Sequence, residues 1–266
     1  MRRLCSVLEV SPSGYYKWRQ RRDHREQSKR EMANQTLLKE MRLIHREVRQ
    51  TYGSPRMHAE LLARGYACSL NRVARVMQVG GIRAKSKRRW RMQTTDSRHG
   101  LPVAPNVLGQ EFTTTAANKK WVADITYIPT RKGWLYLAIV LDLYSRMVVG
   151  WSMDTSMATH LIESALKMAL QTRRPAPSSG LLHHSDRGSQ YASYQYQDLL
   201  ATNGIQASMS RTANVYDNAV MESFFSTIKT ELIHHCDYAT QQEATRDIFR
   251  YIEGFYNRRR RHSALG

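Results

Sequence analysis

The chain has 266 residues, of which 41% are hydrophobic, so it can bury the core of one large domain or of two modest ones. Its longest apolar run, 134–141, is far too short to span a bilayer, and Met1-Arg-Arg does not lead into a signal peptide, so we expect a cytoplasmic protein. Cys5, Cys68 and Cys236 are odd in number and widely spaced, which favours neither a disulfide framework nor a CxxC zinc pair.

The net charge of +19 is concentrated in the first 100 residues. That part holds 24 Lys and Arg against 8 Asp and Glu, a balance of +16, whereas residues 101–266 hold 17 against 14, a balance of +3. A basic part joined to a nearly neutral part is typical of a nucleic-acid-binding module attached to another domain. No basic amphipathic anchor with exposed Trp or Phe is evident, which argues against a membrane partner.

Helical patterns fill the basic part. Residues 1–33 form a basic segment that resembles part of a helix-turn-helix, in which Ser11-Pro12 fits the start of a helix. Three further helices are expected, over 34–50, 56–64 and 70–79. The short connection between the last two predicts a helix-turn-helix DNA-binding region over 34–95. An ordinary three-helix bundle with a solvated basic face is the alternative.

The third of these helices has the features of a recognition helix. It follows Ser69, a favourable N-cap, and its pattern turns Asn71, Arg72 and Arg75 outward. Recognition helices use such residue types in the major groove. We therefore expect these three residues to bind DNA.

A dense run of cations follows at 83–91, where six Lys and Arg surround Trp90. Such a run suits contact with the phosphate backbone, so Arg88 and Arg89 are further candidates for DNA binding. A solvated linker is the plain alternative. Residues 96–115, with Pro and Gly at their centre, are expected to be the linker to the next domain.

Residues 116–266 have the pattern of an α/β domain. Strands are expected at 121–128, 134–142, 147–151, 181–186 and 207–210, and helices at 159–172, 194–202 and 218–235. A last helix should follow the capping box Thr240-Gln-Gln-Glu243. Three successive strands, followed by alternating helix and strand, predict a mixed sheet.

Three carboxylates stand at unusual places in this domain. Asp124 interrupts the apolar strand 121–128, Asp186 ends a strand, and Glu222 lies early in a helix. Each acid taken singly is more often a turn residue, a cap or a salt-bridge partner. An ionised carboxylate beside an apolar core is costly unless it is paired or binds a metal. The three together therefore predict a divalent-cation site with oxygen ligands.

Other charged residues near these positions receive different roles. Lys229 lies seven residues after Glu222 and shares its helix face, so it could hold a phosphate near the carboxylates; a solvated lysine is the alternative. Asp217 and Asn218 are expected to cap the helix that carries Glu222. Asp142 also ends an apolar strand, but we assign it a structural pairing role.

The residues also resemble a known family. In the second half these stretches are Trp121-Val-Ala-Asp-Ile-Thr-Tyr127, Leu141-Asp-Leu-Tyr-Ser-Arg146, His184-Ser-Asp-Arg-Gly-Ser-Gln-Tyr191, Ser208-Met-Ser-Arg211, Asp217-Asn-Ala-Val-Met-Glu-Ser-Phe-Phe225 and Phe255-Tyr-Asn-Arg-Arg-Arg-Arg-His-Ser263. In the first half they are Tyr52-Gly-Ser-Pro-Arg56, Arg72-Val-Ala-Arg-Val-Met77 and Thr95-Asp-Ser-Arg-His-Gly100. Together they closely resemble transposases of the insertion-sequence-three family, second-frame product, in the retroviral-integrase superfamily.

The resemblance implies a fold and an activity. It implies a ribonuclease-H-like, mixed-sheet integrase core over 116–266, with a C-terminal helix and with Asp124, Asp186 and Glu222 as a catalytic DDE triad. That triad would hold two Mg²⁺ ions, with Mn²⁺ as substitute, and Lys229 matches a basic position of the family. The implied reaction is metal-dependent 3′-end cleavage and strand transfer of an insertion sequence.

The resemblance also implies partners. These are double-stranded DNA of the element's terminal inverted repeats and of the target, bound by a homo-oligomer at the bacterial nucleoid. Family members usually continue beyond Gly266 and usually act as a fusion with an upstream frame that carries a leucine zipper. This sequence has no heptad run long enough for a zipper, so we expect an upstream-frame partner or fusion.

Two rival functions remain open at this point. The first is another metal nuclease on the same fold, such as an RNA–DNA hybrid hydrolase, which the basic helix-turn-helix disfavours. The second is a DNA-binding regulator derived from a transposase, whose core no longer reacts.

Overall fold

The computed structural model describes residues 2–23, 29–86, 100–212 and 214–263. These residues form two compact units: the described residues within 2–47 and 52–83 make the first, and those within 48–51 and 84–263 make the second. Arg88 and Arg89 lie outside the described residues. None of the described helices is long and apolar enough to cross a membrane.

The first unit is helical, as the sequence predicts. Its described helices are α1 (Arg2–Val7), α2 (Pro12–Asp23), α3 (Lys29–Glu47), α4 (Ser54–Ala63) and α5 (Leu70–Val79). One face of α3 is buried, with Met41 and Ile44 fully enclosed. Ser69 caps α5, because its hydroxyl accepts a hydrogen bond from the Arg72 amide at 3.3 Å.

The second unit is built around a sheet. Its strands are β1 (Lys120–Thr130), β2 (Gly133–Asp142), β3 (Val148–Asp154), β4 (Leu182–Ser185) and β5 (Gln206–Met209). Its α-helices are α6 (Thr159–Arg173), α7 (Ser189–Ala192), α8 (Tyr194–Thr202), α9 (Ala219–Glu231) and α10 (Gln241–Tyr251). Short 3-10 turns occur at Pro177–Ser179, Val215–Asn218 and Ile233–His235, and a π-helical turn, η4 (Ile252–Tyr256), follows α10.

The strand order is β3-β2-β1-β4-β5. β1, β2 and β3 pair antiparallel, whereas β4 is parallel to β1 and β5 is parallel to β4. This arrangement confirms the mixed α/β sheet and is the ribonuclease-H-like topology that the resemblance implies. The predicted strands and helices of this unit agree with the observed ones to within a few residues.

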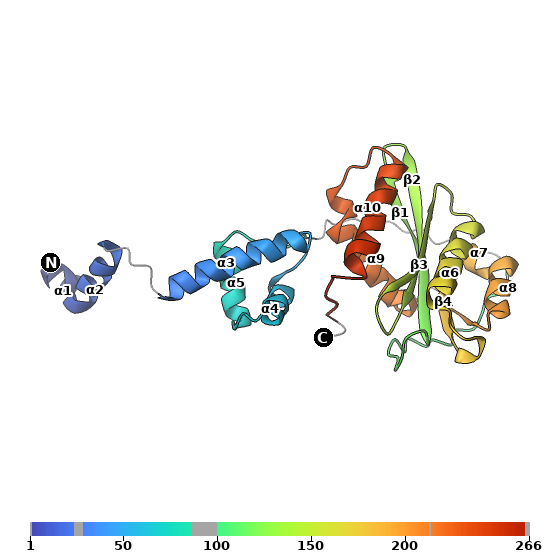
Figure 1. Cartoon of the computed structure of the whole chain (residues 1–266), viewed down its shortest axis with the longest axis horizontal. Coiled ribbons are helices and arrows are strands. Elements are labelled where there is room, and N and C mark those ends of the chain that lie inside the picture. The colour runs from blue at the N-terminus through green and yellow to red at the C-terminus, as the bar shows by residue number, and fades with distance from the viewer. Residues whose placement is uncertain (1, 24–28, 87–99, 213, 264–266) are drawn as a thin grey trace. The chain divides into compact units, whose positions relative to one another are not determined.

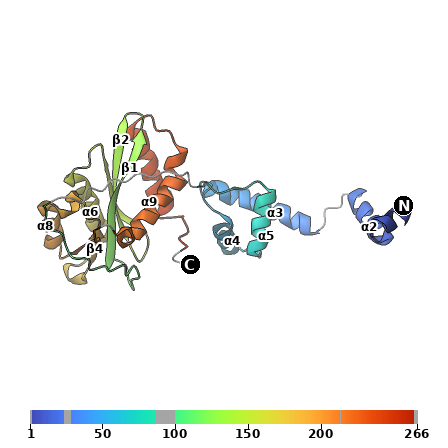
Figure 2. The ribbon, with the colours of Figure 1, turned by 180° about the vertical axis from the view of Figure 1, so that it is seen from behind.

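Helices cover both faces of the sheet (Figures 1 and 2). α6, α7 and α8 lie on one side, and α9 and α10 lie on the other. α6 approaches β3 so closely that a Cβ on Gly150 would lie 2.1 Å from the Ala165 carbonyl oxygen, so only glycine fits there. The buried core between the sheet and α6 includes Trp121 and Ala123 of β1.

Candidate active site

The parallel pairing of β1 and β4 places Asp124 and Asp186 at the same level of the sheet. Trp121 of β1 is opposite His183 of β4, and Val122 is opposite His184. Continuing this register by two residues brings Asp124 beside Asp186, the first residue after β4 ends. The two carboxylates thus come from adjacent strands, although 61 residues separate them in the chain.

The third carboxylate comes from the first turn of α9. Glu222 is exposed there. Asn218, at the start of the helix, donates from Nδ2 to the Ala123 carbonyl oxygen at 3.4 Å. This contact pins the start of α9 to β1 at the residue that precedes Asp124, so Glu222 projects from a helix end that is fixed to the strand.

Asp186 and Glu222 both act electrostatically on Asp124. Burial and the charge of Asp186 raise the pKa of Asp124 well above its ordinary value, and Glu222 raises it further. The Ile125 amide and Lys229 act in the opposite direction but do not cancel the rise. Carboxylates that repel one another in this way are the donor set that a divalent cation stabilises.

The aspartates are held in place by their own backbone. Asp124 Oδ1 accepts from the Ile125 amide at 2.7 Å, and Asp186 Oδ1 accepts from the Gly188 amide at 2.9 Å. Over the described part of the chain, no three His, Cys, Asp or Glu side chains are grouped at the spacing of metal ligands. The carboxyl oxygens suit Mg²⁺ chemically, and Glu222 is exposed at the start of α9.

Lys229 lies two turns along α9 from Glu222, and it contacts an aromatic residue of β1. Its Nζ is 5.0 Å from the centre of the Tyr127 ring. Burial lowers the pKa of Lys229, while the charge of Asp124 raises it. The lysine therefore belongs to the neighbourhood of the carboxylates.

Tyr191, near the carboxylates, was not singled out from the sequence. Its hydroxyl is buried and has no hydrogen-bond partner among the described residues. Burial raises its pKa well above the ordinary value, and the charges of Tyr196, Asp124 and Asp186 add to this rise. In the sequence it stands five residues after Asp186, at the end of the stretch His184–Tyr191 that resembles the family.

Asp217 does not cap α9 as expected. The N-cap is Asn218, which makes no side-chain cap bond. The buried Asp217 carboxylate instead accepts from the Arg211 amide and guanidinium at 2.7 to 3.0 Å. Asn106 and Gln110 each donate to it at 2.8 Å, and Arg211 above all holds its pKa well below the ordinary value. Asp217 thus ties the start of α9 to Arg211 and to the distant segment that holds Asn106 and Gln110.

Asp142 has the structural role assigned from the sequence. It is fully buried, and its oxygens accept from the Asn118 amide at 2.9 Å and from the Ser145 amide and hydroxyl at 2.9 and 2.6 Å. The two bonds from Ser145 close the turn between β2 and β3, and the bond from Asn118 joins Asp142 to the residues before β1. Asp142 is therefore a satisfied acceptor.

The adjacent histidines of β4 are also satisfied inside the core. His183 Nε2 lies 3.1 Å from the Tyr196 hydroxyl, and His184 bonds the hydroxyls of Ser208 and Ser210. Burial lowers the pKa of His183 to about 3 and that of His184 to about 4. Both imidazoles are therefore neutral near pH 7.

The DNA-binding candidates of the first unit differ in exposure. Asn71 and Arg75 are exposed on α5. Arg72 is half-buried, and its Nε donates to Asn34 Oδ1 at 2.9 Å. Arg72 thus also joins α5 to α3.

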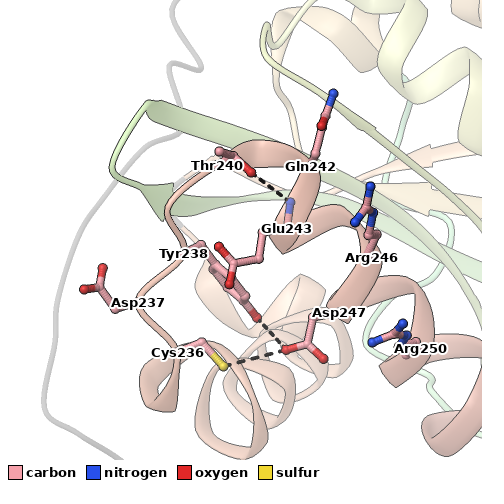
Figure 3. Close-up of a pocket in the computed structure, with 9 residues that line it drawn as sticks. All are labelled: Cys236, Asp237, Tyr238, Thr240, Gln242, Glu243, Arg246, Asp247 and Arg250. Carbon is pink, nitrogen blue, oxygen red and sulfur yellow. Dashed lines mark hydrogen bonds between the residues drawn. The ribbon is translucent and has the colours of Figure 1, made fainter.

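A pocket of about 490 Å³ lies beside α10 and is lined by none of the three carboxylates (Figure 3). Its residues are Cys236, Asp237, Tyr238, Thr240, Gln242, Glu243, Arg246, Asp247 and Arg250. Thr240 accepts from the Glu243 amide at 3.1 Å, which confirms the predicted start of α10. Tyr238 donates to Asp247 at 3.1 Å, so part of the pocket's polar lining is internally bonded.

Comparisons with known proteins give the chain its family. Family models of an integrase core domain match residues 114–215 and 203–266, and a model of an HTH-like domain matches 32–90. The chain is 46% identical over 263 residues to the "Insertion element IS600 uncharacterized 31 kDa protein" of Shigella sonnei, covering 99% of this chain and 94% of that protein. It is 42% identical over 263 residues to "Transposase InsF for insertion sequence IS3A" of Escherichia coli (strain K12), covering 99% of this chain and 90% of that protein.

A solved structure shows a more distant likeness. The HTLV-2 integrase catalytic core domain in complex with magnesium has a TM-score of 0.41 and 18% sequence identity, covering 55% of this chain and 91% of that one. That likeness is too weak to transfer individual residues. The identity to the two curated relatives extends over nearly the whole chain, and the chain therefore belongs to the IS3 family of transposases.

Proposed function

We propose that this chain cuts DNA at the ends of an insertion element and joins the resulting 3′ ends to new DNA, as a DDE-type polynucleotidyl transferase. The observation that carries the proposal is the β1–β4 register, which brings Asp124 beside Asp186, together with the Asn218 bond that fixes the start of α9, and with it Glu222, to β1. Carboxylates brought together in this way repel one another unless a bound cation offsets the repulsion, and the raised pKa of Asp124 agrees with this. Family membership supports the same reaction.

The carboxylates are the proposed ligands of two Mg²⁺ ions, for which Mn²⁺ would substitute. Asp124, Asp186 and Glu222 would hold the ions through their carboxylate oxygens. When bound, such ions activate a nucleophile and stabilise the leaving oxygen of a phosphodiester. The backbone amides of Ile125 and Gly188 orient the two aspartates. Glu222 would join them from the first turn of α9.

The proposed substrate is double-stranded DNA, bound first through the basic helical unit. Asn71 and Arg75 are exposed on α5, where a recognition helix presents such residues. The proposed regions are a basic segment over 1–33, a DNA-binding region over 34–95, a linker over 96–115 and the core over 116–266. Work on two element ends suits a homo-oligomer, and an upstream-frame partner or fusion remains part of the proposal.

The test is incubation of the purified chain with labelled element-end DNA and Mg²⁺, with nicked and joined products scored separately. Asp124→Asn, Asp186→Asn and Glu222→Gln should each lower both products by about 100-fold or more, because each exchange removes a charge that holds the cation. Binding of DNA in Ca²⁺ should persist. Mn²⁺ should replace Mg²⁺.

Two variants serve as controls. Asp198→Asn removes one exposed charge from α8 and should leave activity unchanged. Asp142→Asn should lower stability, because it replaces an acceptor of three hydrogen bonds, but should keep activity in the folded fraction. Metal-independent cleavage, or wild-type turnover by a triad variant, contradicts the proposal. DNA binding without nicks or joints by the wild-type chain favours the inactive-regulator alternative.

A further inference from the structure

Tyr127 lies three residues after Asp124 on β1, and its ring faces the ammonium of Lys229. The distance from Lys229 Nζ to the ring centre is 5.0 Å, within the range of a cation–π contact. Among the described residues β4 pairs with β1 only as far as Val122. Beyond that point no described strand pairs with the β4 side of β1, and a side chain of α9, Lys229, reaches Tyr127.

A second aromatic residue fixes the orientation of the Tyr127 ring. Trp134, at the start of β2, packs edge-to-face on it, with ring centres 5.0 Å apart and planes at 88°. The side chain of Tyr127 is half-buried, whereas Trp134 is 40% exposed. A half-buried ring that is braced by a neighbour presents a fixed face, so it can hold a flexible side chain in one place.

Lys229 needs such a support. A lysine side chain has four rotatable bonds and loses much rotamer entropy when it is fixed. Within the described part of the chain it forms no ion pair at contact distance, and Asp124 acts on it only through space. The contact that restrains its ammonium is therefore the face of the Tyr127 ring.

We infer that Tyr127 is a positioning residue, whose ring holds the Lys229 ammonium near Asp124, where it can meet a phosphate of the DNA end. The inference rests on the proposed function for the identity of the phosphate. It concerns the aromatic ring and not the hydroxyl group, since the cation lies over the ring. Tyr127→Phe should therefore preserve the role, and Tyr127→Leu should remove it.

The placement of Lys229 has a direct spectroscopic test. In the full chain, lysines are reductively methylated with ¹³C, and the Lys229 resonance is assigned by its loss in Lys229→Arg. A methylammonium over an aromatic face should show an upfield ring-current shift. That shift should persist in Tyr127→Phe and disappear in Tyr127→Leu.

The consequence for DNA is measured by titration of element-end duplex in Ca²⁺ and by the KM and kcat of end joining in Mg²⁺. Tyr127→Leu should raise the Kd and KM for DNA by about 3- to 10-fold, the range expected for a lost cation–π contact, with kcat changed less. Tyr127→Phe should keep the Kd and the KM for DNA at their wild-type values.

Tyr136→Leu is the matched control. Tyr136 lies opposite Tyr127 in the β1–β2 register and is also half-buried, but it packs against the core cluster under α6. Tyr136→Leu and Tyr127→Leu should lower thermal stability by similar amounts. Tyr136→Leu should leave the Lys229 ring-current shift and the Kd for DNA unchanged. If the two leucine variants change the Kd for DNA equally, Tyr127 has only a structural role and the inference that it positions Lys229 is wrong.

Failure of this inference is distinguishable from failure of the proposed function. An unchanged Lys229 resonance in Tyr127→Leu overturns the inference, whether or not the protein joins DNA. Wild-type protein that shows the ring-current shift but never nicks or joins DNA overturns the proposed reaction and leaves the placement of Lys229 standing. A lost shift with an unchanged Kd for DNA overturns the role of the contact in binding.

Discussion

At the scale of single residues, Asp124 should make the metal-free protein less stable than it would otherwise be. Its raised pKa means that the folded state binds a proton more readily than the unfolded state, so stability falls as pH rises from about 4 through the raised folded pKa. Asp124→Asn keeps the acceptor for the Ile125 amide and removes the charge. It should raise the free energy of unfolding near pH 7 by about 1 kcal/mol in EDTA.

Chemical denaturation with and without Mg²⁺ measures this effect. Wild-type protein should gain stability when Mg²⁺ is added, because a ligand of the folded state stabilises it, whereas Asp124→Asn should gain much less. If Asp124→Asn is less stable than wild type in EDTA, and its free energy of unfolding does not change with pH, then Asp124 is a structural partner and not a cation ligand.

At the scale of elements, the start of α9 should depend on Asp217. Its pKa is lowered, so its stabilising charge is present above the ordinary value near pH 4 and is lost as pH falls below that value. Asp217→Asn should lower the free energy of unfolding by about 2 kcal/mol at pH 7, because it unpairs Arg211 and weakens the bonds from Asn106 and Gln110.

Hydrogen exchange over 214–222 checks the local part of this prediction. In Asp217→Asn, amide exchange should accelerate more in 214–222 than in the distant β2–β3 turn. End joining should also fall, because the start of α9, which carries Glu222, is no longer held in place. Arg211→Gln, which keeps donors without the charge, should have a smaller effect. Equal acceleration in both regions would indicate general loss of stability.

At the scale of the whole molecule, the basic first 100 residues should dominate the salt dependence of DNA binding. Each lost phosphate contact lowers the slope of log affinity against log salt by about 1. Arg75 is exposed, so Arg75→Ala should reduce the slope by about that amount without lowering thermal stability. Arg72→Ala should lower both, because Arg72 also bonds Asn34. Filter binding from 50 to 300 mM NaCl measures the affinity of each variant for DNA. Asp124→Asn, measured in the same way, should bind DNA like the wild type and so separates DNA binding from catalysis. An affinity that does not change with salt would contradict the assignment of DNA binding to the basic first 100 residues.

The sequence alone determined the local structure and the residue types of the site. Apolar periodicity predicted the strand over 121–128 and the helix over 194–202, and both form there. The Ser69 and Thr240 caps also form, because a cap depends only on residues within one helical turn. Asp124, Asp186 and Glu222 were conspicuous because a charge beside an apolar segment needs an explanation.

Only the tertiary structure decided which distant residues meet. The register of β1 and β4 brings Asp124 beside Asp186, and no local pattern encodes a pairing across 61 residues. Asp217 was expected to cap its helix, but it instead accepts hydrogen bonds from Arg211 and from the distant Asn106 and Gln110. The contact of Lys229 with Tyr127 likewise depends on how α9 packs on the sheet. Local propensity acts over a few residues, whereas these contacts follow from burial of the whole core, which a single stretch of sequence does not contain.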